Sequence, residues 1–223
     1  MKKVSEPFQK HEVEEYERKR YRGLDQRIVD AREQSILNKF LEQITKMKGL
    51  ALDLPCGYGR FSKLLRGQGL KPINCDISFH MVKRACEKSG WIASSAGAGA
   101  VANAKQGLPF KDGVFQVVFS LRFFHHLHEK EARIFILNEF SRVSKGWVVL
   151  SFYQVNLLHK IQRQLRRKVK KSSTRIKMLL TEEFAEEIEQ AGLKPVQVVS
   201  LFKGLHSQHI ALLKKKSNLQ GES

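Results

Sequence analysis

One short segment organises this chain: Leu52-Asp53-Leu54-Pro55-Cys56-Gly57-Tyr58-Gly59-Arg60. The apolar residues 50–52 have the character of a strand, and residues 61–65 have the character of a helix start. Between them, two glycines allow a sharp turn and a close approach of a ligand to the backbone. A strand, a glycine turn and a helix start are typical of the loop that binds a nucleotide-type cofactor in a doubly wound α/β fold.

The acid at the end of the first strand indicates which cofactor this loop binds. A carboxylate at Asp53 would repel the pyrophosphate of a dinucleotide and attract a ligand that carries an ammonium and a sulfonium group. Ser62 also stands where the dinucleotide fingerprint has its third glycine. The residues therefore favour S-adenosylmethionine over NAD.

A second acid supports a nucleoside site. Asp76 ends a second short strand, 72–76, at roughly the 20-residue distance from Gly57 that one βαβ step requires. A carboxylate at that place can accept two hydrogen bonds from a ribose diol.

Three ordered patterns resemble the class I S-adenosylmethionine-dependent methyltransferases, and together they cover roughly residues 45–155. The first is the segment around Asp53, and the second is Asp76-Ile77-Ser78-Phe79-His80-Met81. The third is the segment 108–118, Leu-Pro-Phe-Lys-Asp-Gly-Val-Phe-Gln-Val-Val, followed by Ser120-Leu121-Arg122-Phe123-Phe124-His125-His126-Leu127. This third pattern is similar to that of the ubiquinone/menaquinone-biosynthesis methyltransferase-like subgroup. Three residues depart from the family pattern: Pro55 replaces a loop glycine, Asn103 an acid, and Gln116 an aspartate.

The resemblance implies a set of cofactor-binding residues. Asp53, Gly57 and Gly59 would hold the methionine end, Asp76 the ribose, and Asn103 the adenine edge, while Ser120 and Leu121 would face the outer side of the cofactor. The predicted set also includes Pro55, Arg60, Ile77, Met81 and Ala104. No metal site is expected.

His125 and His126 are the candidate catalytic residues. A histidine beside the acceptor could take a proton from the nucleophile, since its pKa lies near neutrality. The alternative is a packing or capping pair inherited with the fold, because methyl transfer often requires only an in-line approach in a dry pocket.

The predicted fold is α/β: a Rossmann-like, doubly wound, mainly parallel sheet with an antiparallel closing strand. Residues 1–45 are interpreted as an N-terminal helical lid segment, to which Tyr16, Arg20 and Tyr21 could contribute, or else as a charged surface segment. Residues 46–223 are interpreted as the methyltransferase domain, with a basic insertion at about 155–180.

Strands are expected at 49–54, 71–75, just before Asn103, 114–120, 146–153, 196–202 and 209–214. Helices are expected at 26–46, 59–67, 79–89 and 130–143, and one more begins with Thr181 as N-cap.

Composition limits the class of protein. The chain has 223 residues, of which 42% are hydrophobic, and this excludes a disordered polypeptide. No apolar run is long enough to cross a bilayer, and the charged N-terminal residues lack a signal core. The three cysteines have no zinc-binding spacing and favour a reduced, cytoplasmic protein.

A net charge of +18 indicates an anionic partner. One acid-free stretch, 158–177, concentrates the basic residues and spaces its apolar residues as in an amphipathic helix. It could lie on an anionic membrane and present a lipid-linked substrate, grip nucleic-acid phosphates, or form a solvated lid. The first and third interpretations are favoured over nucleic acid, since the chain shows no RNA-binding signature and no motif for methylating base amines or base carbons.

The expected function is methyl transfer from S-adenosylmethionine to a small-molecule or lipid-linked acceptor. The alternatives are an RNA methyltransferase and a non-catalytic cofactor-binding adaptor for anionic surfaces. The expected location is the cytoplasm, with or without peripheral contact with the inner face of a membrane. The sequence leaves the oligomeric state open.

Overall fold

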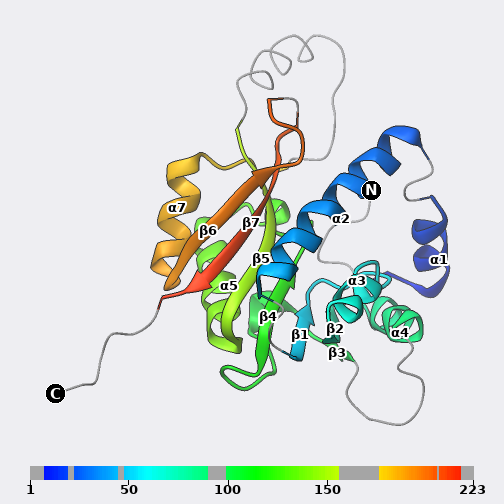
Figure 1. The fold of residues 1–223 in the computed structure, drawn as a ribbon. Coiled ribbons are helices and arrows are strands. Elements are labelled where there is room, and N and C mark those ends of the chain that lie inside the picture. The colour runs from blue at the N-terminus through cyan, green and yellow to red at the C-terminus, as the bar shows by residue number, and fades with distance from the viewer. Residues whose placement is uncertain are drawn as a thin grey trace.

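The strands form one seven-stranded sheet in the order β3-β2-β1-β4-β5-β7-β6 (Figure 1). The computed structural model describes residues 8–19, 23–44, 48–89, 99–155, 176–204 and 206–216. Five strands are parallel: β1 (Gly49–Asp53), β2 (Leu70–Asp76), β3 (Gly99–Val101), β4 (Phe115–Ser120) and β5 (Ser144–Tyr153). The strand β7 (Gln208–Lys215) runs antiparallel to β5 and to the edge strand β6 (Leu193–Ser200). This confirms the predicted mainly parallel sheet with an antiparallel closing strand.

The register brings the predicted site residues to one edge of the sheet. Asp53, the last residue of β1, lies opposite Phe119 of β4 on one side and Asn74 of β2 on the other. Because parallel strands all end at the same edge, Asp53, Asp76 and Ser120 finish their strands there together. The strand order reverses between β1 and β4, and such a switch point is where open α/β sheets bind their ligands.

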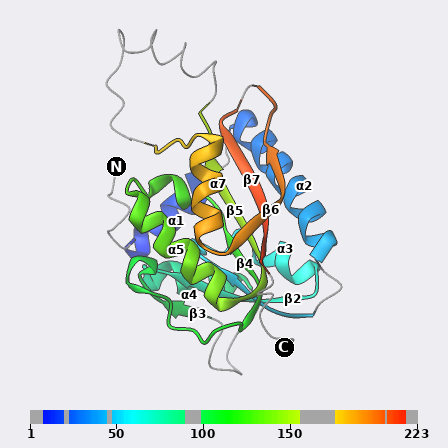
Figure 2. The same ribbon diagram turned by 90° about the vertical axis from the view of Figure 1, so that its left-hand side faces the viewer.

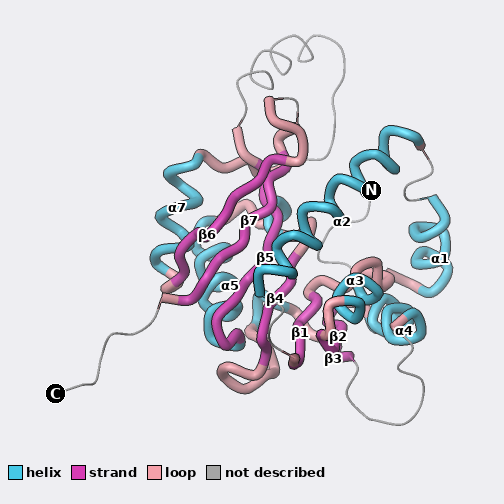
Figure 3. Tube along the Cα trace, in the orientation of Figure 1, coloured by secondary structure: helices cyan, strands magenta, loops and turns pink. Residues whose placement is uncertain are grey.

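Helices cover both faces of the sheet, as the colours of Figure 3 make plain. Figures 1 and 2 show α2 (Leu24–Ile44) and α3 (Ser62–Gly67) on one face, and α5 (Lys130–Val143) and α7 (Thr181–Gln190) on the other. Helix α4 (Phe79–Lys88) packs beside β2 and β3, and α1 (Lys10–Lys19) packs on α4. Two short 3-10 helices, η1 (Ala104–Gln106) and η2 (Phe124–His126), follow β3 and β4.

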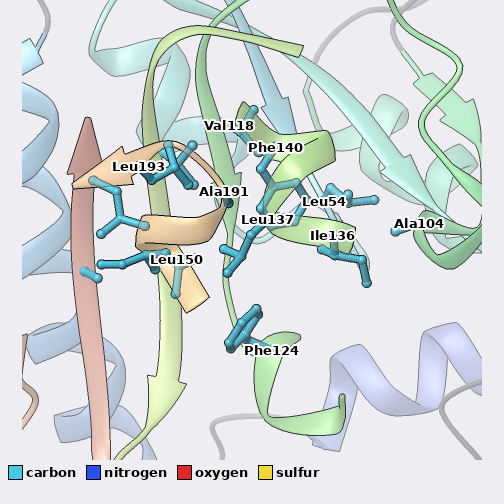
Figure 4. Packing of buried hydrophobic residues seen from close by; sticks show 14 of the residues in the cluster. Leu54, Ala104, Val118, Phe124, Ile136, Leu137, Phe140, Leu150, Ala191 and Leu193 are labelled. Atoms are coloured by element: carbon cyan, nitrogen blue, oxygen red, sulfur yellow. The ribbon is translucent and has the colours of Figure 1, made fainter. Parts of the chain in front are cut away.

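Two apolar clusters, one on each face, hold the sheet. Leu137 and Phe140 of α5 pack with Val118, Leu150 and Leu193 on one face (Figure 4). Leu37 and Phe40 of α2 pack with Phe119 on the other face. Strand β4 is therefore buried on both sides, as its continuous apolar run predicts.

A buried ion pair joins α5 to α7. Arg133 donates to both carboxylate oxygens of Glu187 and to the backbone oxygens of Leu127 and His128. Both charged side chains are almost fully excluded from water. Removing either partner would leave the other charge buried without a countercharge, at a cost of about 3–5 kcal/mol.

Several predicted boundaries need correction. Helix α3 begins at Ser62 rather than at 59, because the glycine turn extends further. Strand β6 begins at Leu193 rather than at 196, because Pro195 is tolerated in a strand that pairs on one side only.

The predicted N-cap Thr181 is wrong. Leu180 occupies the N-cap position, and its backbone N–H donates to the Glu183 carboxylate (3.5 Å). The Thr181 hydroxyl instead accepts from the side chain of Gln154. Glu183, at the third position of the first turn of α7, thus provides the cap that Thr181 was expected to provide. The predicted amphipathic helix within 158–177 lies outside the described residues except at its end.

Candidate functional site

The loop after β1 is held at the carboxyl edge of the sheet by backbone hydrogen bonds. The N–H of Cys56 donates to the Cys75 carbonyl (2.8 Å), and the N–H of Gly59 donates to the Cys56 carbonyl (3.0 Å). These bonds tie the loop to the end of β2. The predicted strand, turn and helix are therefore all present, in the predicted order.

The two loop glycines have different tasks. Gly59 has a φ of +79°, and a Cβ there would lie 2.7 Å from the Cα of Ala85, so Gly59 permits the close packing of α4. Gly57 has a φ of +50°, and a Cβ there would meet none of the described residues within 4 Å. Gly57 therefore borders open space that a ligand could fill, whereas Gly59 serves the packing of the fold.

Asp76 is fixed by the loop that it faces. The N–H of Gly57 donates to its Oδ2 (3.1 Å), and the N–H of Ser78 donates to its Oδ1 (3.0 Å). Burial raises the pKa of Asp76, and the backbone N–H groups of Ser78, Gly57 and Ile77 oppose that rise. Each carboxylate oxygen has a further lone pair, so the arrangement still suits a ribose diol.

Asp53 is the most unusual ionisable group of this edge. Its side chain is 1% exposed, and its Oδ2 has no hydrogen-bond partner among the described residues. Burial, and then the charge of Asp76, raise its pKa to about 8, although Arg60 opposes the shift. The hydroxyl of Ser120, at the end of β4, is likewise buried and has no partner within the described part of the chain.

These features fit the amino-acid end of S-adenosylmethionine. A buried carboxyl oxygen without a partner is unfavourable, and a ligand ammonium would supply both a donor and a countercharge. The space beside Gly57 adjoins the diol acceptor Asp76 at the end of β2, which accepts a hydrogen bond from the Gly57 N–H.

Helix α1 lies over this region. Val13 of α1 packs with Tyr58 of the loop and Met81 of α4, and the rings of Tyr16 and Tyr58 are 6.1 Å apart. Glu17 forms ion pairs with Arg84 and Lys88 of α4. The sequence alone did not indicate these contacts. Arg20 and Tyr21 lie outside the described residues. Met81 is therefore placed beneath α1, next to the loop.

The predicted adenine contact lies beyond β3. Asn103 accepts a hydrogen bond from the N–H of Lys105 (3.1 Å) and thereby caps η1, in which Ala104 is buried. The N–H of Ala102 donates to the Asp76 carbonyl (3.0 Å), which holds this turn beside the ribose acid. The adenine role of Asn103 stays a prediction.

Arg60 contacts α2 rather than open space. Its guanidinium pairs with Asp30 and Glu33, so the side chain links the loop to α2. Glu33 is the functional candidate that sequence reasoning missed. A signal existed, because Glu33 lies three and four residues before Ile36 and Leu37 on the apolar face of a helix.

His125 and His126 form part of η2, at the carboxyl end of β4. Their rings lie 4.0 Å apart, and the ring of His125 lies 4.7 Å from that of Tyr153 at the end of β5. The His125 carbonyl accepts from the N–H of Lys177 (2.9 Å). This location agrees with either a catalytic or a packing role, so catalysis by either histidine stays a prediction.

The Leu-Pro-Phe pattern stabilises the fold. Arg142 of α5 donates to the backbone oxygens of Leu108 and Phe110 and to the carboxylate of Asp112. The N–H of Leu108 donates to Glu139 in turn. The third motif thus ties the segment before β4 to α5.

Two further findings concern the described residues alone. No group of three His, Cys, Asp or Glu side chains there could hold a metal ion. None of the helices in those ranges combines the length and apolarity that a bilayer crossing requires.

Comparison with known proteins identifies this architecture. Residues 52–152 match the family described as "Methyltransferase domain". The demethylmenaquinone methyltransferase of Thermobifida fusca (strain YX) is 33% identical over 106 residues, which are 46% of this chain and 43% of that protein. The chain thus matches less than half the length of that relative.

Solved structures show the same fold at low sequence identity. A magnesium protoporphyrin IX methyltransferase from Synechocystis PCC 6803 superposes with a TM-score of 0.69 at 16% identity, over 87% of this chain and 88% of that one. A S-adenosylmethionine-dependent methyltransferase from Methanosarcina mazei gives a TM-score of 0.60 at 18% identity, over 76% of this chain and 93% of that one. The motif order, the strand order and the domain match agree, and together they support a class I S-adenosylmethionine-dependent methyltransferase.

Proposed function

We propose that this protein transfers the methyl group of S-adenosylmethionine to a small-molecule or lipid-linked acceptor. The observation that carries the proposal is the buried Asp53 carboxyl group at the switch point of the sheet, one oxygen of which has no partner among the residues that the structure describes. When bound, the cofactor supplies a methyl group activated by its sulfonium charge.

The chain would contribute binding, orientation and the exclusion of water. Asp53 binds the ammonium, Asp76 the ribose and Asn103 the adenine edge, while Ser120 and Leu121 border the outer face. Within the segment 1–45, α1 acts as the lid, because it packs over the loop through Val13 and Tyr16, whereas α2 packs against the sheet. Excluding water strengthens each electrostatic contact with the bound ligand.

A small-molecule acceptor is supported by the relatives. Two of the three that we compared are named for a small-molecule substrate, demethylmenaquinone in one and magnesium protoporphyrin IX in the other. His125, at the end of β4, would face the acceptor side and take the proton where the acceptor is a hydroxyl group. The class of acceptor remains part of the proposal.

The basic stretch would bring the protein to an anionic membrane surface. Its flanks are held at the end of β5: the N–H of Val155 donates to the Leu179 carbonyl (3.0 Å), and the N–H of Leu179 donates to the Tyr153 carbonyl (2.8 Å). The backbone N–H of Lys177 likewise donates to the His125 carbonyl (2.9 Å). The flanks of the positive charge therefore lie beside the proposed acceptor side, and a lipid-linked acceptor could be taken from the inner face of a membrane.

Isotope transfer tests the function. The protein would be incubated with methyl-labelled S-adenosylmethionine and three acceptor classes: hydroxylated isoprenoid quinone precursors, porphyrin carboxylic acids and RNA. Label in either of the first two supports the proposal, whereas label in RNA alone overturns the acceptor class. Cofactor binding without any transfer would favour the adaptor alternative.

A further inference from the structure

One fully buried glutamate connects three segments at the carboxyl edge of the sheet. Glu33 of α2 is 0% exposed. Its carboxylate pairs with Arg60 (Nη2 to Oε2, 2.6 Å) and accepts from Arg122 through Nε (3.3 Å) and Nη2 (2.9 Å). It also accepts from the side-chain amide of Gln208 (2.8 Å).

The three donors come from segments that surround the proposed cofactor site. Arg60 follows the glycine loop after β1, Arg122 follows β4, and Gln208 begins β7. Since β7 is antiparallel, its first residue lies at the same edge as the last residues of β4 and β5. Glu33 thus joins both sides of the switch point to α2.

The backbone of Arg122 requires such an anchor. Its φ is +60°, a conformation that costs a residue other than glycine about 1–2 kcal/mol. The N–H of Arg122 donates to the Ser151 hydroxyl (2.7 Å), and its guanidinium is held by Glu33. These two contacts fix the turn that directly follows Ser120 and Leu121.

Electrostatics keeps Glu33 charged. Burial raises the pKa of Glu33, but the charges and hydrogen bonds of Arg122 and Arg60 together outweigh burial and leave that pKa lowered. Glu33 in turn balances part of the charge of Arg60, which is the cation that acts on Asp53.

We propose that Glu33 is a positioning residue of the cofactor site: through Arg60 and Arg122 it holds the glycine loop and the turn after β4 in the arrangement that binds the cofactor's amino-acid end. The inference rests on the proposed function. It adds a residue of α2, far from the loop motifs in sequence, to the machinery of that site.

A pair of matched variants tests this role. Glu33→Gln and Glu187→Gln each neutralise a glutamate that is 0% exposed and paired with arginine, but Glu187 joins α5 to α7 on the opposite face. Both variants should lose thermal stability. Only Glu33→Gln should weaken S-adenosylhomocysteine binding, by about tenfold in calorimetric titration.

The pH dependence of binding provides a readout that a purely structural role would not change. Asp53 faces Asp76, Arg60 and the thiols of Cys56 and Cys75. Since the ligand ammonium pairs with the ionised form of Asp53, affinity should rise with pH as Asp53 loses its proton. With Glu33 neutralised, Arg60 loses one countercharge, keeps Asp30 and acts more strongly on Asp53, so this rise should move to lower pH. The pH dependence of binding should be the same in Glu187→Gln as in the wild-type protein.

A second pair covers the case in which Glu33→Gln does not fold. Arg122→Gln removes a side chain that is 22% exposed and leaves Glu33 paired with Arg60, and Arg142→Gln, in α5, is its control. Arg122→Gln should weaken binding several-fold, and Arg142→Gln should not.

The outcomes separate this inference from the proposed function. If the wild-type protein binds S-adenosylhomocysteine and both site variants bind it equally well, Glu33 has no positioning role. If the wild-type protein does not bind, the proposed function fails first and the inference falls with it.

Discussion

Asp53 and Ser120 end two neighbouring parallel strands, and each has a buried side-chain oxygen with no hydrogen-bond partner among the described residues. Such oxygens are rare in folded proteins, and each costs about 1–3 kcal/mol when it is left unsatisfied. Their occurrence together at the switch point is the feature that a ligand with hydrogen-bond donors would explain.

The unusual pKa of Asp53 predicts how stability changes with pH. Because the pKa of this carboxyl is raised from 3.8 to about 8, the folded protein keeps a proton that the unfolded chain releases. The contribution of Asp53 to stability is therefore greatest at low pH and declines as pH rises from about 4 to about 8. Asp53→Asn should remove this decline, so the variant should exceed the wild type in stability increasingly toward pH 8. Denaturant unfolding of the ligand-free proteins between pH 4 and pH 9 measures the difference, and parallel curves would refute the assignment.

The two acids should discriminate between two ligands. Asp53→Asn should weaken S-adenosylhomocysteine binding about tenfold or more, which is about 1.4 kcal/mol, but leave 5′-methylthioadenosine nearly unaffected, because that nucleoside lacks the ammonium. Asp76→Ala should weaken both ligands strongly, since both carry the ribose diol. Calorimetric titration of the two variants with the two ligands gives the four values. Unchanged affinity in Asp76→Ala would remove Asp76 from the site.

Alanine substitutions at the two loop glycines should have different effects on stability and on ligand binding. Gly59→Ala places a methyl group against the backbone of Ala85 and should destabilise the fold by at least about 2 kcal/mol. The methyl group of Gly57→Ala meets no atom of the described residues, and the substitution should cost about 1 kcal/mol through its positive φ. Its methyl group would, however, enter the space assigned to the cofactor. Gly57→Ala should therefore lose ligand affinity while it keeps a cooperative unfolding transition, and equal affinity to wild type would contradict this assignment of the space.

The basic stretch 158–177 should contribute to binding of anionic surfaces but not to binding of the cofactor. Neutralising Arg166, Arg167, Lys170 and Lys171 should weaken sedimentation with vesicles that contain anionic lipid and spare S-adenosylhomocysteine affinity. Neutral vesicles provide the control for non-electrostatic binding, and a salt series should weaken the wild-type interaction. If cofactor affinity collapses instead, the stretch belongs to the cofactor lid. Retained RNA binding with no vesicle binding would favour the nucleic-acid alternative.

Local patterns predicted most of the fold because each strand carries its own signal. The strand runs before Asp53 and Asp76, and the two-sided apolar run of β4, specify a parallel α/β sheet with the site at its carboxyl edge. Boundaries were less predictable where a long-range partner determines them. Leu180 is an N-cap because Glu183 serves it, and β6 begins early because it needs only one partner strand.

The part of the site that sequence could not predict is the part built between distant segments. Glu33 acquires its role only when α2 brings it to Arg60, Arg122 and Gln208. Likewise, Arg60 resembles a loop residue in sequence, but its guanidinium is engaged by α2. A single sequence without the tertiary fold gives no measure of such pairings.

The most direct test of the account is a calorimetric titration of the wild-type protein with S-adenosylmethionine, S-adenosylhomocysteine and NAD. Micromolar binding of the first two and none of NAD is expected, because the two acids repel an anionic pyrophosphate, whereas Asp53 pairs with the ligand ammonium and Asp76 accepts hydrogen bonds from the ribose. Binding of NAD alone, or no binding of either sulfur-containing ligand, would contradict it.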